Sequence, residues 1–308
     1  MRVALFGGTG FVGSYLVDAL VDAGHEPSLL VRSGSEDKVR RSSECRVVGG
    51  SIESATEVAA TLDGCDAAIY CIGILRENRS KGVTFEALQY EGAARVADLA
   101  AEAGIRRFLL MSANGVRMPG TPYQETKFRA ERHVREHEFD ATIFRPSVIF
   151  GDPRGRMEFA TQLYRDMVSP PLPAVVFRTG TLPSSDPVVM SPVHVEDVAD
   201  AFVAALGNPE TYGQTLELGG PEILTWSAML DRIGAATARR KLKLPMPIPL
   251  MRLAAAALDW LPFCPVTRDQ LTMLAEGNTA SPDVLAQLIG RDPKSFSAES
   301  LHYLLRRS

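Results

Sequence analysis

A glycine-rich turn between an apolar run and a helical pattern constrains the fold of this chain most strongly. Residues 2–6 read Arg-Val-Ala-Leu-Phe, and Gly7, Gly10 and Gly13 follow at intervals of three as the helical pattern begins. Gly7 permits a tight turn after the strand, Gly10 lets the backbone approach a pyrophosphate, and Gly13 lets the helix pack closely on the sheet. Unpaired N–H groups at the helix N-terminus then bind the phosphates. The turn therefore predicts a dinucleotide site.

A cation stands where the second predicted strand ends. The helical pattern at 11–23 is followed by an apolar run at 27–31, which predicts that strand, and Arg32, Ser33 and later Lys38 come next. An NAD-selective site needs an acid there to bind the ribose 2′-hydroxyl, whereas a cation suits the 2′-phosphate of NADP. A solvated arginine at a strand end is the alternative interpretation. We expect NADP(H) to be favoured over NAD(H).

Strand and helix patterns continue to alternate along the chain. Strands are predicted at 45–48, 66–71, 106–111 and 141–145, with helices at 55–62, 84–103 and 123–137 between them. Such alternation predicts an α/β fold with a Rossmann-type, doubly wound parallel sheet. Proline, glycine and arginine interrupt the pattern after residue 151. We expect residues 1–151 with 188–218 to form an NADP(H)-binding domain, and 152–187 with 219–308 to form a smaller, mainly helical C-terminal lobe that binds a substrate or partner.

Composition narrows the class of protein. The 308 residues are 45% hydrophobic, which supplies an ample core, and the net charge of -4 gives no basic footprint for nucleic acid. The four cysteines form no C-x-x-C pair and read as reduced thiols. The first predicted strand begins at residue 2, which leaves no room for a signal peptide, and no run of about twenty apolar residues occurs. A cytoplasmic protein is expected.

Tyr123 and Lys127 lie four residues apart in a helical pattern beyond the predicted strand at 106–111. They are therefore about 40° apart on one helix face and can act on the same ligand. A nearby ammonium, together with a positive nicotinamide, lowers a tyrosine pKa that is ordinarily about 10, which makes the phenol an acid or base. The lysine also suits the nicotinamide ribose. A plain surface pair is the alternative.

Several stretches resemble the short-chain dehydrogenase/reductase superfamily in its extended or atypical branch. The G-x-x-G-x-x-G spacing is typical of it, and so is the order of the stretches 109–116, 123–127, 143–151 and 192–199. Residues 72–77, 84–92 and 111–117 resemble most the atypical group that includes the nucleotide-binding accessory subunit of mitochondrial complex I and its bacterial relatives. Nearly the first 220 residues are covered.

The resemblance implies a set of site residues. At the pyrophosphate, the cofactor-binding residues would be Gly7, Thr9, Gly10, Phe11, Val12 and Gly13. Arg32 and Ser33 would bind the 2′-phosphate, and Ser51 and Ile52 stand where an acid often holds the adenine amine. Ile72 and Gly73 would lie at the ribose, and Lys127 and Pro146 at the nicotinamide. The catalytic residues would be Tyr123 as acid/base, Lys127 as its pKa partner, and Ser112 or Asn114 orienting the substrate.

Departures from the family pattern leave two functions open. The usual serine donor beside the tyrosine is shifted from Ser112 toward Asn114, and Gln89 stands where catalytic relatives have asparagine. One function is an NADP(H)-binding oxidoreductase acting on a carbonyl, sugar-nucleotide or quinone-like substrate. The other is a non-catalytic NADPH-binding protein with a structural, assembly or redox-sensing role.

Residues 133–137 match H-x-x-E-H, a zinc-protease arrangement. By helical geometry His133 and His137 lie about 80° to 120° from Lys127, and the sequence shows no obvious third ligand nearby. A charged solvent face explains them, so we expect no metal. His194 is interpreted as a polar residue at a helix start.

Residues 241–263 are apolar, broken by prolines and flanked by cations. One interpretation is a lobe helix buried over the active-site cleft. The other is an interfacial element, with Trp260 and Phe263 entering a membrane and Lys241, Lys243 and Arg252 contacting lipid phosphates. The second would suit peripheral association with the inner face of a membrane or with a respiratory complex.

Overall fold

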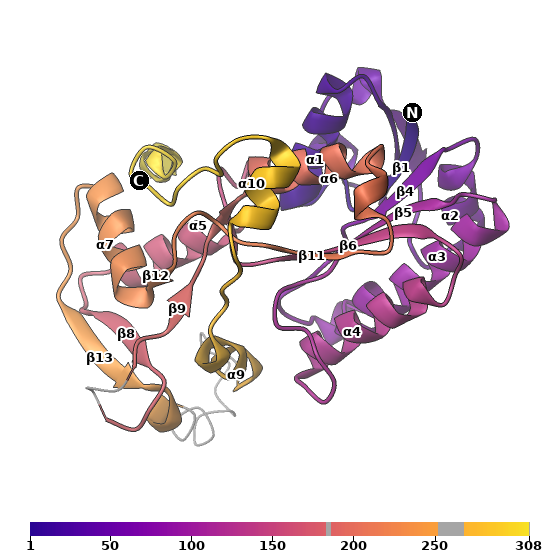
Figure 1. Cartoon of the computed structure of the whole chain (residues 1–308). Helices are drawn as coiled ribbons and strands as arrows, with labels where there is room; N and C mark the ends of the chain where they lie inside the picture. The colour runs from indigo at the N-terminus through magenta and orange to yellow at the C-terminus, as the bar shows by residue number, and fades with distance from the viewer. Residues whose placement is uncertain (183–185, 252–267, 308) are drawn as a thin grey trace. The chain divides into compact units, whose positions relative to one another are not determined.

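The computed structural model describes residues 1–182, 186–251 and 268–307 (Figure 1). The chain divides into two compact units, which are described one at a time. The first unit comprises Met1–Pro146, Val195–Glu217 and Val284–Arg291, and the second Ser147–His194, Leu218–Asp283 and Asp292–Ser308. The chain therefore leaves the first unit three times and returns to it twice.

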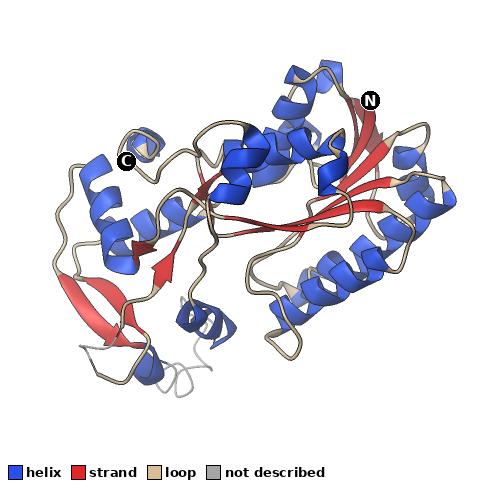
Figure 2. Ribbon diagram, in the orientation of Figure 1, coloured by secondary structure: helices blue, strands red, loops and turns tan. Residues whose placement is uncertain are grey.

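The first unit is built on a seven-stranded sheet with helices on both sides (Figure 2). Its strand order is β11-β6-β5-β4-β1-β2-β3, and every pairing among β1 to β6 is parallel. The strands are β1 (Arg2–Phe6), β2 (Glu26–Val31), β3 (Arg46–Gly49), β4 (Ala67–Tyr70), β5 (Arg107–Met111), β6 (Asp140–Pro146) and β11 (Thr215–Leu218). The strand order reverses direction beside β1, as in a Rossmann fold. The predicted α/β doubly wound sheet is confirmed.

Helices cover both faces of this sheet, as Figure 1 shows. On one side lie α2 (Ala55–Leu62), α3 (Gly92–Glu102) and α4 (Pro122–Arg135), and on the other α1 (Phe11–Asp22) and α6 (Val195–Leu206). The short helix α10 (Asp283–Ile289) ends beside α6, where Arg291 pairs with Asp197 and Asp200. Because both faces are covered, all four residues of β4 and all five of β5 are buried. This burial explains the continuous apolar runs that predicted these strands.

The helix predicted at 84–103 is continuous but changes its geometry. Residues Glu86–Glu91 form a π-helical segment, and regular α3 begins at Gly92. Gln89 lies in this segment with its side chain buried, donating from Nε2 to the Ile74 carbonyl at 2.8 Å. Its Oε1 accepts from the Thr126 hydroxyl at 3.1 Å. The π-helical segment therefore ties α4 to the loop after β4.

A buried arginine fixes the returning segment 195–217 to the sheet. Arg107, on β5, donates to the carbonyls of Ala205 and Leu206 at the end of α6, at 2.6 and 3.1 Å. It also donates to the hydroxyls of Thr142 and Thr211, at 2.9 and 3.0 Å. Burial lowers the pKa of Arg107 to about 10. These bonds satisfy the guanidinium inside the protein and hold α6 against β5 and β6.

The second unit combines short helices with two-stranded pairings. Its elements are β7 (Ile149–Phe150), α5 (Phe159–Leu163), β8 (Ala174–Arg178), β9 (Val189–Met190), β10 (Val193–His194), β12 (Leu224–Thr225), α7 (Trp226–Ala236), β13 (Lys243–Pro247) and α9 (Arg268–Glu276). The pairs are β10 with β7, β12 with β9, and β13 with β8. Their shared core includes Phe150, Trp226 and Phe296. His194 is buried at the end of β10, directly before α6, with its ring edge-on to Phe150.

Of the segment 241–263, the structure describes residues 241–251. Residues Lys243–Pro247 form strand β13, parallel to β8, and residues 248–251 are helical. The Lys241 ammonium donates to the Pro170 and Leu172 carbonyls, and Lys243 donates to Ser227 and pairs with Asp231, so both cations have protein partners. Arg252, Trp260 and Phe263 lie outside the described residues. Within the described ranges, no helix has the length and apolarity needed to cross a membrane.

Helix α4 begins with a capping box, which we expect to stabilise the protein. The Thr121 hydroxyl accepts from the Gln124 N–H, and the Gln124 side chain accepts from the Thr121 N–H at 2.9 Å. We predict that Thr121→Ala lowers the free energy of unfolding by about 1 kcal/mol, whereas Thr121→Ser retains the cap and most of the stability. Urea unfolding of the three proteins measures the difference. Equal stability of the alanine and serine variants would contradict it.

Candidate functional site

The glycine turn has the geometry that the sequence predicted for each glycine. Gly7 has φ of +107°, where a side chain is strained. A Cβ at Gly13 would lie 2.0 Å from the Gly7 carbonyl oxygen, so only glycine lets α1 approach the turn this closely. Gly10 donates to the Gly7 carbonyl at 2.9 Å and is exposed. The turn therefore brings the start of α1 directly over the end of β1.

The N-terminus of α1 can receive an anion. Its N-cap is Gly10, which has no side chain to cap the first N–H groups of the helix. The helix is 12 residues long and has no acidic residue in its first turn that would repel a phosphate. Exposed N–H groups at the positive end of a helix bind phosphate. This fits the pyrophosphate position predicted for Gly7, Thr9, Gly10, Phe11, Val12 and Gly13.

The predicted site residues follow the carboxyl ends of neighbouring strands. Arg32 and Ser33 come after β2 and are exposed, Ile72 and Gly73 follow β4, Ser112 and Asn114 follow β5, and Pro146 ends β6. In a parallel sheet these ends lie along one edge, next to the turn after β1. The structure thus brings the predicted nucleotide and catalytic residues of the first unit to one edge of its sheet.

The loop after β3 is closed by an acid that the sequence reasoning did not select. Glu57, in the first turn of α2, accepts from the Ser51 N–H at 2.6 Å. The Ile52 side chain is buried in the core, and its carbonyl accepts from Arg95 at 3.0 Å. The position of Ser51 is therefore set by Glu57, six residues further along the chain. An acid at this spacing, just inside a helix with a serine cap at Ser54, was the available signal.

Lys127 lies buried beneath the edge residues. Its Nζ donates to the Met111 carbonyl at 3.0 Å and lies 5.9 Å from the centre of the Tyr123 ring. A Cβ placed on Gly73 would be 3.7 Å from this Nζ, so the loop after β4 passes directly beside it. Burial lowers the pKa of Lys127 to about 8, although the carboxylate of Glu131 raises it. Tyr123 and Lys127 therefore share one side of α4, as their spacing predicted.

The pKa of Tyr123 shifts in the direction opposite to the expectation. Burial raises the pKa of this phenol, and its ring packs edge-on against Phe85 at 5.7 Å. The expected lowering relied on the lysine together with a positively charged nicotinamide. In the protein alone, removal of the phenol from water outweighs the nearby lysine. The Tyr123 hydroxyl is therefore protonated at neutral pH.

A carboxylate one turn beyond Lys127 organises the interior of the site. Glu131 is fully buried and forms a bidentate pair with Arg145 of β6, at 2.8 and 2.7 Å. It also accepts from the Ser112 hydroxyl at 2.5 Å. Glu131 and Arg145 were not among the site residues predicted from the sequence. The available signal was the spacing of Lys127 and Glu131, which places an acid and a base on one helix face.

The hydrogen bond from Ser112 to Glu131 bears on its predicted role in orienting the substrate. The Ser112 side chain is buried, and its hydroxyl donates to Glu131. The backbone N–H groups of Ser112 and Asn114 continue the β5–β6 ladder to Phe144 and Pro146, at 2.7 and 3.0 Å. Asn114 is half-buried at this edge. Of the two predicted orienting residues, Asn114 is the more accessible.

The lowered pKa of Lys127 predicts a pH dependence of stability. Because the ordinary value is 10.5 and the folded value about 8, the unfolded chain binds more protons between these pH values. Stability contributed by Lys127 should therefore rise as pH increases from about 8 to 10.5, by on the order of 2 kcal/mol relative to Lys127→Met. Urea unfolding of both proteins at pH 7 and pH 10 measures this. Parallel pH profiles would rule it out.

The pair of Glu131 and Arg145 generates a stability prediction. Glu131→Gln removes the charge that Arg145, Ser112 and Lys127 face inside the protein. We predict a loss of about 3 kcal/mol in the free energy of unfolding, because the remaining cations lose a buried partner. Glu138→Gln, an exposed change near the end of the same helix, is the control and should be close to neutral. Similar values for both variants would argue against the network.

Comparisons with known proteins identify the family of this chain. The pattern of the NAD(P)H-binding family matches residues 7–168, more than half of the chain. The mitochondrial NADH dehydrogenase (ubiquinone) 1 alpha subcomplex subunit 9 of Arabidopsis thaliana is 29% identical over 298 residues, covering 91% of this chain and 70% of the relative. The ceramide reductase of Caulobacter vibrioides is 32% identical over 208 residues, covering 67% of this chain and 61% of the relative.

Among solved structures, the crystal structure of gox2253 has a TM-score of 0.78 at 21% identity, covering 99% of this chain and 97% of that one. It shows the same fold. The resemblance to atypical short-chain dehydrogenase/reductases is thereby confirmed, and the chain belongs to the NAD(P)H-binding family.

Proposed function

We propose that this protein is an NADP(H)-dependent reductase that reduces a carbonyl to an alcohol, with Tyr123 as general acid. The observation that carries the proposal is the arrangement of Tyr123 and Lys127 on one side of α4, with Lys127 beside the loop after β4. The glycine turn after β1 supplies the neighbouring phosphate site at the same sheet edge. Substrate and nicotinamide would meet between them.

Tyr123 can supply the proton that reduction of a carbonyl requires. When bound, the reduced nicotinamide supplies a hydride to the carbonyl carbon, and the carbonyl oxygen then needs a proton. The Tyr123 hydroxyl is protonated at neutral pH, which lies below the ordinary tyrosine pKa of about 10 and further below the raised pKa of this buried phenol. It can give that proton to the oxygen, and Lys127 then stabilises the resulting phenolate. Lys127 is also placed to donate to the nicotinamide ribose, since the loop at Gly73 passes beside its Nζ.

The proposed preference for NADP(H) rests on Arg32. This residue is exposed one position beyond β2, where the adenine ribose lies in Rossmann folds. A guanidinium there would bind the 2′-phosphate with two hydrogen bonds, whereas the 2′-hydroxyl of NAD offers it no charge. Ser33 is exposed beside it and can donate to the same phosphate.

A second candidate function is supported by Ser112. Because Glu131 accepts the Ser112 hydroxyl, the substrate-orienting donor expected beside Tyr123 is used inside the protein. A site that binds NADPH without turning it over would suit a structural or sensing protein. Relatives named as complex I subunits favour a peripheral role of this kind, in association with a respiratory complex at the inner face of a membrane. For the reductase, Asn114 would be the orienting donor, and a cytoplasmic location is proposed.

Removal of the Tyr123 hydroxyl tests catalysis apart from binding. We predict that Tyr123→Phe lowers kcat by roughly 10²- to 10⁴-fold while the affinity for NADPH stays within about twofold, because the ring and its contact with Phe85 remain. Steady-state turnover on a panel of ketones and quinones, with NADPH binding by fluorescence titration, measures both quantities. Bound NADPH without turnover by either protein across the panel would favour the second candidate.

Replacement of Arg32 tests the proposed preference for NADPH over NADH. Arg32→Ala should weaken NADPH binding by roughly 10- to 100-fold and leave NADH binding unchanged, since only NADPH carries the 2′-phosphate. Arg46→Ala is a matched control, because Arg46 is an exposed arginine at the start of β3, bonded to the Asp63 carbonyl. Fluorescence titration of wild type and both variants with NADPH and with NADH gives the six affinities. An equal loss for NADH and NADPH would refute the assigned role.

A further inference from the structure

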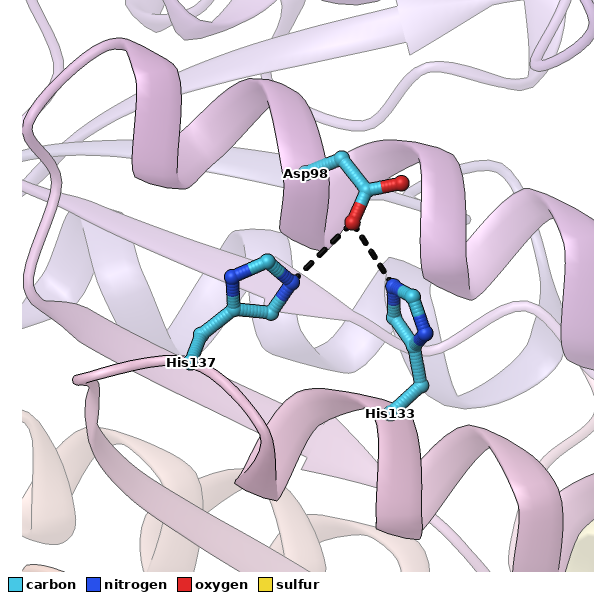
Figure 3. A group of neighbouring side chains, drawn as sticks. All are labelled: Asp98, His133 and His137. Atoms are coloured by element: carbon cyan, nitrogen blue, oxygen red, sulfur yellow. Dashed lines mark hydrogen bonds and ion pairs between the residues drawn. The ribbon is translucent and has the colours of Figure 1, made fainter.

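Three metal-binding side chains meet between helices α3 and α4, away from the residues used above. Asp98 comes from α3, His133 from the last turn of α4, and His137 from the turn that follows α4 (Figure 3). The sequence suggested no third ligand for the two histidines, because Asp98 lies 35 residues before His133. Packing of α3 against α4 supplies it.

The three groups converge on one point. Nε2 of His133 lies 2.7 Å from Oδ1 of Asp98, and Nε2 of His137 lies 3.0 Å from the same oxygen. All three ligand atoms lie within 4.8 Å of one another. A tetrahedral zinc ion with bonds of about 2.0 Å separates its ligand atoms by about 3.3 Å. The two separations between an imidazole and Asp98 would therefore open by about 0.6 and 0.3 Å around such an ion.

Aromatic contacts restrict how the two imidazoles can turn. The His133 ring lies edge-on to Tyr90, with ring centres 6.4 Å apart, and the His137 ring lies 5.1 Å from that of Phe139. Nδ1 of His133 lies 3.9 Å from the Glu136 carboxylate. Such outer partners hold metal-binding histidines in orientation. The site is therefore partly preorganised, with both Nε2 atoms directed to Asp98.

The site is also accessible to ions. The side chains of His133 and His137 are 23% and 24% exposed, and that of Asp98 is 49% exposed. Two imidazoles and one carboxylate form a ligand set typical of Zn²⁺. Among the described residues the group has three protein ligands, so water would complete the coordination.

We propose that Asp98, His133 and His137 bind a zinc-class divalent ion that joins α3 to the end of α4. Both Nε2 atoms must be unprotonated to bind the ion, so each neutral imidazole would then carry its single proton on Nδ1. Helix α4 carries Tyr123, Lys127 and Glu131 on its preceding turns, so the ion would stabilise the helix that positions the candidate site. The alternative arrangement is a pair of hydrogen bonds from the imidazoles to Asp98, with no ion.

Zinc binding by the full chain separates these alternatives. After treatment with EDTA and its removal, the wild-type protein should take up one Zn²⁺ per chain in equilibrium dialysis, and zinc should raise its Tm. Co²⁺ should produce visible absorption bands in the same protein. His137→Asn and Asp98→Asn should weaken Zn²⁺ binding at least about 10- to 100-fold. His302→Asn, an exposed histidine of the second unit, is the control and should behave as wild type.

Two results would overturn the proposed zinc site. A wild-type Tm that zinc does not change, or Zn²⁺ binding equal in wild type and His137→Asn, would assign the three residues to hydrogen bonding alone. Asp98→Asn preserves the side-chain size and an oxygen that can accept from the histidines, so its Tm in EDTA should stay near wild type. Because dialysis and Tm require neither nucleotide nor substrate, their outcome is independent of the proposed reductase.

Discussion

The candidate site depends on one buried carboxylate, that of Glu131. It joins the end of β5 through Ser112, strand β6 through Arg145, and the lysine one turn earlier on α4 through its charge. A carboxylate with no exposed surface needs such partners, because burial of an unpaired charge is expensive. The bonds from Glu131 to its partners therefore fix the distance between α4 and the sheet edge. This distance in turn sets the positions of Tyr123 and Lys127. The same bonds remove Ser112 from the substrate side.

This arrangement explains why one fold supports two candidate functions. The proposed nucleotide site uses the backbone at Gly7 to Gly13 and the start of α1, which need no catalytic side chain. In the proposed reduction, Tyr123 gives the carbonyl oxygen the proton that its hydroxyl carries at neutral pH. A protein with the first feature alone would hold NADPH as a structural element. With both features and an accessible Asn114, it would reduce a carbonyl.

Local patterns in the sequence predicted much of the fold. The strands of the parallel sheet, the glycine turn and the pair Tyr123/Lys127 all depend on residues close together in the chain. Contacts between distant segments were not predictable. The bond of Ser112 to Glu131, the approach of Asp98 to His133, and the pairing of β13 with β8 each require the tertiary structure. The rise in the Tyr123 pKa likewise depends on packing around the phenol.

We propose that the edge formed by the glycine turn, Arg32 and Lys127 binds NADPH in one defined orientation. A crystal structure of the protein with NADPH tests this orientation. We expect the pyrophosphate at the N–H groups of Phe11 and Val12, the 2′-phosphate at Arg32, and the nicotinamide ribose within hydrogen-bonding distance of Lys127 Nζ. Nucleotide density elsewhere on the protein, or a nicotinamide directed away from Tyr123 and Lys127, would contradict it.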